Sequence, residues 1–101
     1  MIHEFDSTDL NHVYTREEIE EALNNLGESC LLYDDLDEAF VGFTRRPNAP
    51  LLAVYSYERI ISIRSYRDGM TYEQAVEFTD FNTCGAWMGE GTPLILYPIE
   101  F

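Results

Sequence analysis

The chain has 101 residues, of which 46% are hydrophobic and 14% aromatic, and its nineteen acidic and six basic side chains give a formal net charge of −13. This length fits one domain, and the aromatic content is typical of a folded protein rather than of a disordered acidic tail. Direct binding to nucleic acid is not expected, because phosphate contacts need clustered Lys and Arg. We predict a single acidic domain over 1–101, with 1–14 as an N-terminal arm.

The hydropathy pattern predicts a cytoplasmic protein. No apolar run approaches the length of about 18 residues that a membrane-spanning helix requires. The first ten residues, MIHEFDSTDL, lack the basic region and the apolar core of a secretory signal. Two cysteines do not make a disulfide framework, and Cys30 falls in an apolar run where a free thiol packs as a small hydrophobe.

The first predicted element is a helix in YTREEIEEALNNLG, residues 14–27. Thr15 and Glu18 have the spacing of a capping box, in which each side chain bonds to the backbone of the other residue. Apolar residues recur at helical spacing from Ile19 to Leu26, and Gly27 follows as a residue that ends helices.

Three strands are predicted next, at SCLLY (29–33), AFVGFT (39–44) and LLAVY (51–55). The second and third are separated by RRPNAP, whose prolines and asparagine are turn-forming residues. We therefore predict a hairpin from these two strands.

Residues 56–67 are open to two interpretations. ISIRSY alternates as a strand does, whereas Ser56 is a suitable N-cap and Tyr57, Ile60, Ile61 and Arg64 fall on one helical stripe. The stripe favours a helix.

The last predicted helix begins at Thr71, whose partner in a second capping box is Gln74, and fades near Gly85. LILYPI (94–99) is the closing strand. The resulting order, α-β-β-β-α-α-β, predicts an α+β fold with a small antiparallel sheet of about four strands and about three helices on one face.

The stretch FNTCGAWMGEGTP (81–93) holds a cysteine, the tryptophan and three glycines, residue types that form active-site loops in other proteins. Cys84 has no histidine at the spacing of a papain-like protease, and the glycines follow a helix instead of preceding one as in a phosphate loop. A helix end, a turn and a packed Trp87 explain the stretch better. The acidic run DDLDE (34–38) lacks the register and glycine of a calcium loop. We assign no catalytic residue, no cofactor and no metal ligand.

DGMTYEQAVEFTDFNTCGAWMGEGTP (68–93) resembles a block shared by small, uncharacterised proteins encoded by bacteriophages and other mobile elements. DEAFVGF (37–43) is similar to their second shared block. The resemblance implies a common fold, a phage setting and the cytosol of the host cell. It carries over no catalytic or binding residue, and the acidic N-terminal helix lies outside it.

The charge is uneven, since the first forty residues hold twelve acidic residues and one arginine. Small acidic phage proteins often occupy the basic nucleic-acid groove of a host enzyme. We therefore predict a non-enzymatic protein that binds a host or phage protein with a basic surface, as an inhibitor of a host defence nuclease or a CRISPR-type complex. The predicted partner-binding residues are Glu17, Glu18, Glu20, Glu21, Asp34, Asp35, Asp37 and Glu38.

Two alternatives stay open. A regulatory or assembly module would bind a phage or host protein through the motif face around Asn82 and Trp87, and a small-ligand binder or enzyme is the third function. The arginines Arg45, Arg46, Arg59, Arg64 and Arg67 either pair locally or line one basic side that would support self-association.

Overall fold

The structure is a computed structural model that describes residues 12–99, so most of the predicted arm 1–14 lies outside the described part. Helix α2 spans Arg16–Leu26. Both capping-box hydrogen bonds are present, from the Glu18 N–H to the Thr15 hydroxyl at 3.1 Å and from the Thr15 N–H to the Glu18 carboxylate at 2.9 Å. Gly27 ends the helix in the left-handed conformation, with φ 68°. The prediction for this element is confirmed.

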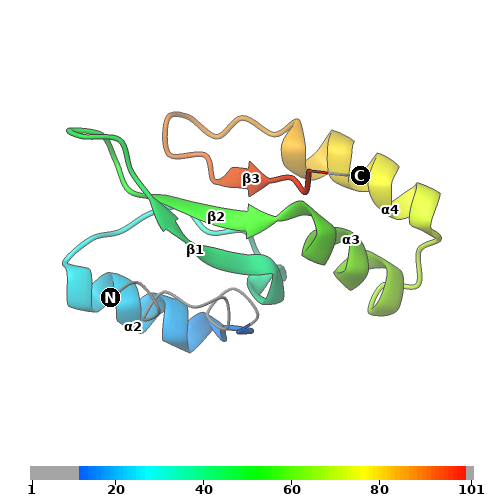
Figure 1. Ribbon diagram of the computed structural model, residues 1–101, viewed down its shortest axis with the longest axis horizontal. Coiled ribbons are helices and arrows are strands. Elements are labelled where there is room, and N and C mark those ends of the chain that lie inside the picture. The colour runs from blue at the N-terminus through cyan, green and yellow to red at the C-terminus, as the bar shows by residue number, and fades with distance from the viewer. Residues whose placement is uncertain (1–11, 100–101) are drawn as a thin grey trace.

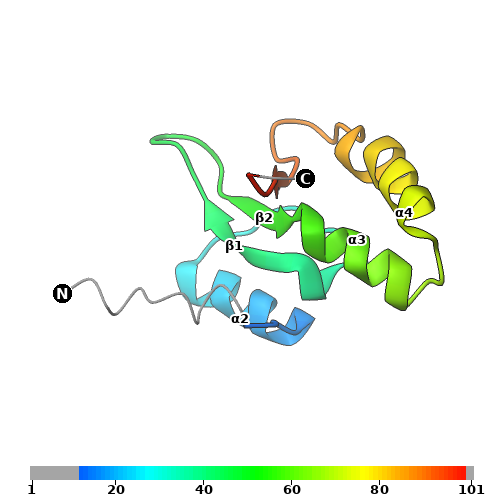
Figure 2. The ribbon, with the colours of Figure 1, turned by 45° about the vertical axis from the view of Figure 1, so that its right-hand side comes forward.

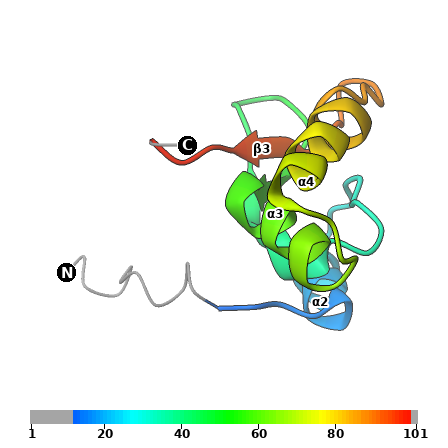
Figure 3. The same ribbon diagram turned by 90° about the vertical axis from the view of Figure 1, so that its right-hand side faces the viewer.

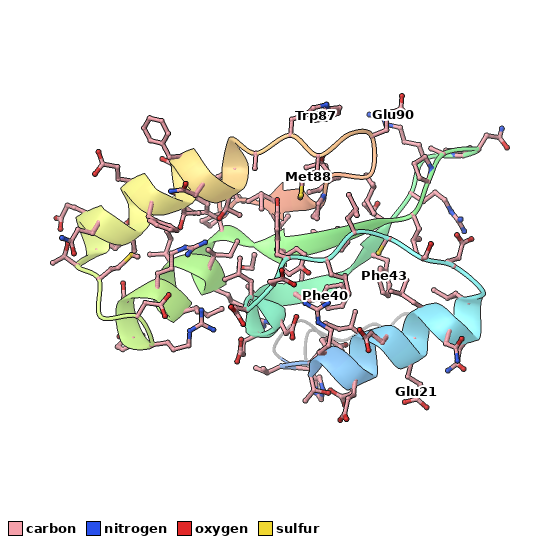
Figure 4. The ribbon with its side chains drawn as sticks, turned by 180° about the vertical axis from the view of Figure 1, so that it is seen from behind. Glu21, Phe40, Phe43, Trp87, Met88 and Glu90 are labelled. Carbon is pink, nitrogen blue, oxygen red and sulfur yellow. The ribbon has the colours of Figure 1, made fainter. Side chains whose placement is uncertain are left out.

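The predicted strand at 29–33 is wrong, because these residues form no ladder with another strand. Residues 28–36 instead cross one face of the sheet as an irregular segment, seen in front of the strands in Figure 4. Cys30 and Leu32 pack against the core from this segment, and the backbone N–H of Tyr33 donates to the Tyr55 hydroxyl at 3.0 Å. These residues are apolar because they pack against the core, and not because they pair in a sheet.

The predicted hairpin is confirmed. Strand β1, Phe40–Thr44, follows a short 3-10 turn at Asp37–Ala39 and pairs antiparallel with β2, Leu52–Ser56. The register sets Phe43 opposite Ala53 and is interrupted by a bulge between Phe40 and Gly42.

The closing strand β3, Leu94–Leu96, pairs parallel with β2, so the sheet is mixed and has three strands in the order β1-β2-β3 (Figure 1). The α+β class is confirmed, whereas the purely antiparallel sheet of about four strands is wrong. A parallel neighbour needs a long crossover, and the two helices between β2 and β3 provide it.

Helix α3, Tyr57–Tyr66, follows β2 directly, and the Ser56 hydroxyl caps it by accepting from the Arg59 N–H at 3.2 Å. The helical interpretation of this segment is confirmed. Helix α4, Tyr72–Thr79, begins with the predicted capping box at Thr71 and continues into a π-helical turn, Asp80–Cys84. Figures 2 and 3 show α3 and α4 side by side.

The core lies on the sheet face that bears Ala53 and Tyr55, where α2 contributes the buried Ile19. A second, smaller cluster joins α3 to α4 through Tyr57, Ile61 and Ala75 and meets Ile95 of β3. The opposite sheet face is more open, since Leu94 and Leu96 are about half exposed. The face that bears Tyr55 is covered by residues 28–36 as well as by helices, whereas the sequence predicted helices alone.

Candidate functional site

The predicted acidic residues of α2 form an exposed face of the helix. Glu17, Glu20 and Glu21 are exposed, and no ion pair is recorded for them within residues 12–99. Figure 4 shows Glu21 pointing away from the body of the molecule. Glu20 is three residues after Glu17 and Glu21 follows it directly, so all three carboxylates lie on the side of α2 away from its buried residues.

Glu18 has a structural task instead. The hydrogen bond from the Thr15 N–H lowers the pKa of its carboxyl, and His12 Nε2 lies 3.8 Å from the same oxygen. A carboxylate held by the cap of its own helix is less available to a partner than its neighbours are.

The acidic turn 34–38 lies beside the start of α2 and is partly neutralised by Arg16. The guanidinium contacts the Asp37 carboxylate at 3.1 Å, approaches Asp34 at 3.9 Å and donates to the Tyr33 carbonyl at 2.8 Å. Burial alone would lower the pKa of Arg16, but its hydrogen bond and charge interaction with Asp37 raise it. Arg16 therefore joins the two acidic stretches and reduces the charge of the turn.

Arg67 approaches the same turn from the end of α3. Its guanidinium donates to the Asp35 carbonyl at 2.7 Å and to the Asp68 carboxylate at 3.0 Å, and it also interacts with the charge of Glu38. The acidic run of the sequence signalled a charged patch, but it gave no sign that two distant arginines would meet it. On the α2 face, Arg16 also interacts with the charge of Glu20, but no ion pair is recorded for Glu17, Glu20 or Glu21 within residues 12–99.

An open groove of about 670 Å³ adjoins this face, between α2 and residues 28–32. Glu20, Glu21 and Glu28 are among its lining residues, together with the apolar Leu31. Glu28 pairs with Arg45 at 2.7 Å, and Arg16, which also lines the groove, interacts with the charge of Glu20. The groove extends the acidic surface and adds apolar area to it.

Trp87, predicted to be packed, is 76% exposed. The loop that carries it is held by Thr92, whose hydroxyl accepts from the Met88 N–H at 2.7 Å and donates to the Gly89 carbonyl at 2.6 Å. The indole lies on the surface, so the prediction of a packed Trp87 is wrong. In Figure 4, Trp87 lies on the opposite side of the molecule from Glu21.

Asn82, the other residue of the predicted motif face, donates from its side-chain amide to the Phe78 carbonyl at 3.1 Å. It therefore satisfies the backbone at the end of α4. Its side chain is exposed, with one of its two amide N–H donors used in this bond.

The arginines do not form one basic side. Arg64 is buried, where its Nε donates to the Thr79 hydroxyl at 3.0 Å and one terminal nitrogen to the Thr83 hydroxyl at 2.7 Å. Desolvation by burial lowers the pKa of its guanidinium. Arg59 donates to the His12 carbonyl at 3.2 Å. Local pairing, the alternative to a basic side, accounts for these contacts.

Cys84 packs against the cluster between α3 and α4 and shares a hydrogen bond with Tyr97. This bond and burial raise the pKa of the Tyr97 hydroxyl to about 12. Cys30 is half-buried, and burial raises the pKa of its thiol. Both thiols therefore pack against apolar clusters.

Within residues 12–99, no helix has the length and apolar character needed to span a membrane, and no group of three or more His, Cys, Asp or Glu side chains has a geometry that could hold a metal ion. A scan against family models finds no match to this chain, and neither does a search of curated proteins or of solved structures. The resemblance to phage-encoded proteins stays a prediction.

Proposed function

We propose that the protein acts by binding, and that the exposed carboxylates of α2 dock on a basic surface of another protein. The supporting observation is that Glu17, Glu20 and Glu21 share one face of α2 and have no recorded ion pair among residues 12–99. The capping box and Gly27 fix both ends of this helix, so the three charges are presented by a rigid element. A preorganised charged face binds with a smaller entropic cost than a flexible one.

The class of partner follows from this charge and from the resemblance to phage proteins. Carboxylates arranged on a helix can replace phosphates in a groove that normally holds nucleic acid. The proposed partner is a host defence nuclease or a CRISPR-type complex, inhibited by occupation of its nucleic-acid groove. The proposed site is the α2 face, with Asp34 and Glu38 beside it.

The test is inhibition of purified defence nucleases and CRISPR-type complexes by the wild type and by two matched variants. Glu20→Lys/Glu21→Lys reverses two charges on the α2 face, and Glu58→Lys/Glu90→Lys reverses two exposed charges elsewhere. The first variant is expected to inhibit at least about tenfold less well, because like charges would then face each other. The second should inhibit nearly as well as the wild type.

Ionic strength provides a second readout. Wild-type affinity should fall as salt increases, since the contacts are between exposed charges. Equal inhibition by the wild type and Glu20→Lys/Glu21→Lys would rule out the α2 face as the binding site.

The exposure of Trp87 favours a second candidate, a regulatory or assembly module that binds through this side chain. Exposed tryptophans are enriched among the residues that dominate interfaces. Trp87→Ala should then abolish partner binding and leave the melting temperature within about 2 °C, because the indole contributes little to the core. Because Trp87 and Glu21 lie on opposite sides of the molecule, the two variants test separate surfaces.

A further inference from the structure

A cleft of about 700 Å³ runs along α4 beside the start of α3. Seven residues line it, three aromatic, three acidic and one aliphatic: Tyr57, Tyr72, Phe81, Glu73, Glu77, Asp80 and Val76. No arginine is among them. The volume is in the range of sites that bind small molecules or single side chains.

The aromatic side chains give the cleft an apolar floor and exposed walls. Tyr57 is buried and forms part of the floor, whereas Tyr72 is 61% and Phe81 is 77% exposed. Phe81 belongs to the π-helical turn, which continues α4 with a different spacing and leaves this ring in solvent. Two large exposed rings that line one cleft give a partner an apolar surface to bury.

The three carboxylates follow one stripe of α4 and its π-helical turn. Asp80 accepts a hydrogen bond from the Tyr57 hydroxyl at 2.9 Å, so its carboxylate is fixed above the floor of the cleft. No ion pair is recorded for Glu73, Glu77 or Asp80 within the described residues. Aromatic faces beside unneutralised carboxylates are the combination that attracts an organic cation.

The molecule contains one such contact already. The guanidinium of Arg64 lies 4.6 Å from the centre of the Phe78 ring, with two threonine hydroxyls as its hydrogen-bond acceptors. A guanidinium in the cleft would find similar ring faces and, in addition, charged acceptors.

We propose that this cleft is a second docking site, which takes an arginine- or lysine-bearing amphipathic segment of a partner protein. The cation lies against the Phe81 ring and pairs with Asp80 and Glu77, while apolar neighbours of the segment cover Tyr72, which stands nine residues earlier along the same helix. This inference goes beyond the proposed function, because the cleft belongs to α3 and α4 and the acidic face belongs to α2 (Figure 2).

The probe is an acetylated and amidated amphipathic peptide in which arginines and leucines alternate at helical spacing, titrated into the isotope-labelled protein. Backbone amide shifts should cluster at residues 57, 72–73, 76–77 and 80–81. Phe81→Ala should weaken binding about three- to thirtyfold, the range of cation–π contacts from exposed to desolvated sites, and Tyr72→Ala, which removes apolar contact, should weaken it less. Tyr66→Ala is the matched aromatic control, since this ring is 90% exposed and lies outside the cleft.

The charge control separates specific docking from general attraction to an acidic protein. Glu73→Gln/Glu77→Gln should weaken binding, and Glu58→Gln/Glu90→Gln, at exposed carboxylates that do not line the cleft, should leave both the shifts and the affinity nearly unchanged. Shifts spread over α2, or equal losses in both charge variants, would overturn the proposal.

Two other occupants are distinguishable. Free arginine amide can be titrated in place of the peptide. If it binds as tightly, the cleft is a site for small cations, and the proposal that it docks a protein segment is wrong. Shifts at the same residues that depend on protein concentration without peptide would show self-association and also overturn it. The peptide titration tests the cleft and the nuclease assay tests the α2 face. Either proposal can therefore fail while the other holds.

Discussion

The phenolic oxygen of Tyr55 in β2 accepts the backbone N–H of Tyr33 at 3.0 Å, and the two rings lie 4.8 Å apart between centroids. A side chain of the sheet therefore satisfies the backbone of the segment that crosses it. This contact holds residues 28–36 against the core without a fourth strand. It also fixes the position of the acidic turn that follows.

Tyr55→Phe tests this relationship. The substitution keeps the ring and leaves the Tyr33 N–H without its acceptor in a half-buried place, so the free energy of unfolding should fall by about 1–3 kcal/mol. Urea unfolding followed by circular dichroism measures it. Tyr66→Phe, at a solvent-exposed ring, is the control and should change little. An unchanged midpoint for Tyr55→Phe would mean that the segment is held by packing alone.

Arg64 is expected to be a main support of the α3–α4 pair. Arg64→Lys offers a single ammonium that cannot reach Thr79 and Thr83 with the same fork geometry, and it should destabilise the protein by about 1–3 kcal/mol. Arg46→Lys, at an exposed position, should stay within about 0.5 kcal/mol of the wild type. If both variants unfold alike, the two hydroxyl contacts contribute no measurable stability.

Gly85 follows a helix, but its need for a glycine comes from a close backbone contact and not from a left-handed conformation. Its φ is −84°, which any residue adopts, but a β-carbon there would lie 3.0 Å from the Phe81 carbonyl oxygen. Gly85→Ala should therefore lower the free energy of unfolding by about 1–3 kcal/mol, as other overpacking substitutions do. The melting temperature should fall with it. At Gly91 the nearest atom is the Leu31 side chain at 3.5 Å, an ordinary contact, so Gly91→Ala should be nearly neutral. Equal melting temperatures for the two variants would contradict the steric explanation.

Stability should fall on the alkaline side. Burial raises the pKa of Tyr55 from 10.0 to about 12, and the hydrogen bond with Cys84 does the same for Tyr97. The unfolded chain loses these protons near pH 10.0 and the folded chain holds them to about pH 12, so the stabilisation is complete below pH 10.0 and is lost as pH rises through this window. Urea midpoints across the window measure the loss. Tyr97→Phe should make the decline shallower, and an identical decline would exclude Tyr97 as a contributor.

The capped helices were predictable because their signals are local. Thr15 with Glu18, and Thr71 with Gln74, specify hydrogen bonds between residues three apart, and no distant part of the chain changes them. The hairpin was predictable for the same reason, since one turn sets its register.

The errors concern interactions between distant residues. Residues 29–33 form no strand because Tyr33 bonds to the side chain of Tyr55 instead of to a strand backbone. The direction of β3 depends on where α3 and α4 bring the chain back to the sheet. The exposure of Trp87 depends on a loop closed by Thr92, and composition alone suggested a core residue. For the candidate surfaces, the sequence indicated the acidity but not the arginines that neutralise one half of it.

The parallel pairing of β2 with β3 constrains the order of folding. The hairpin β1–β2 closes over a short turn, whereas β3 can pair only after α3 and α4 have brought the chain back along the sheet. Pairs of high sequence separation form slowly, because the loop must close before the contacts form. Because β3 follows β1 and β2 in the chain, it is also synthesised after both of them. We therefore expect the α3–α4 unit to be the nucleus on which the sheet is completed.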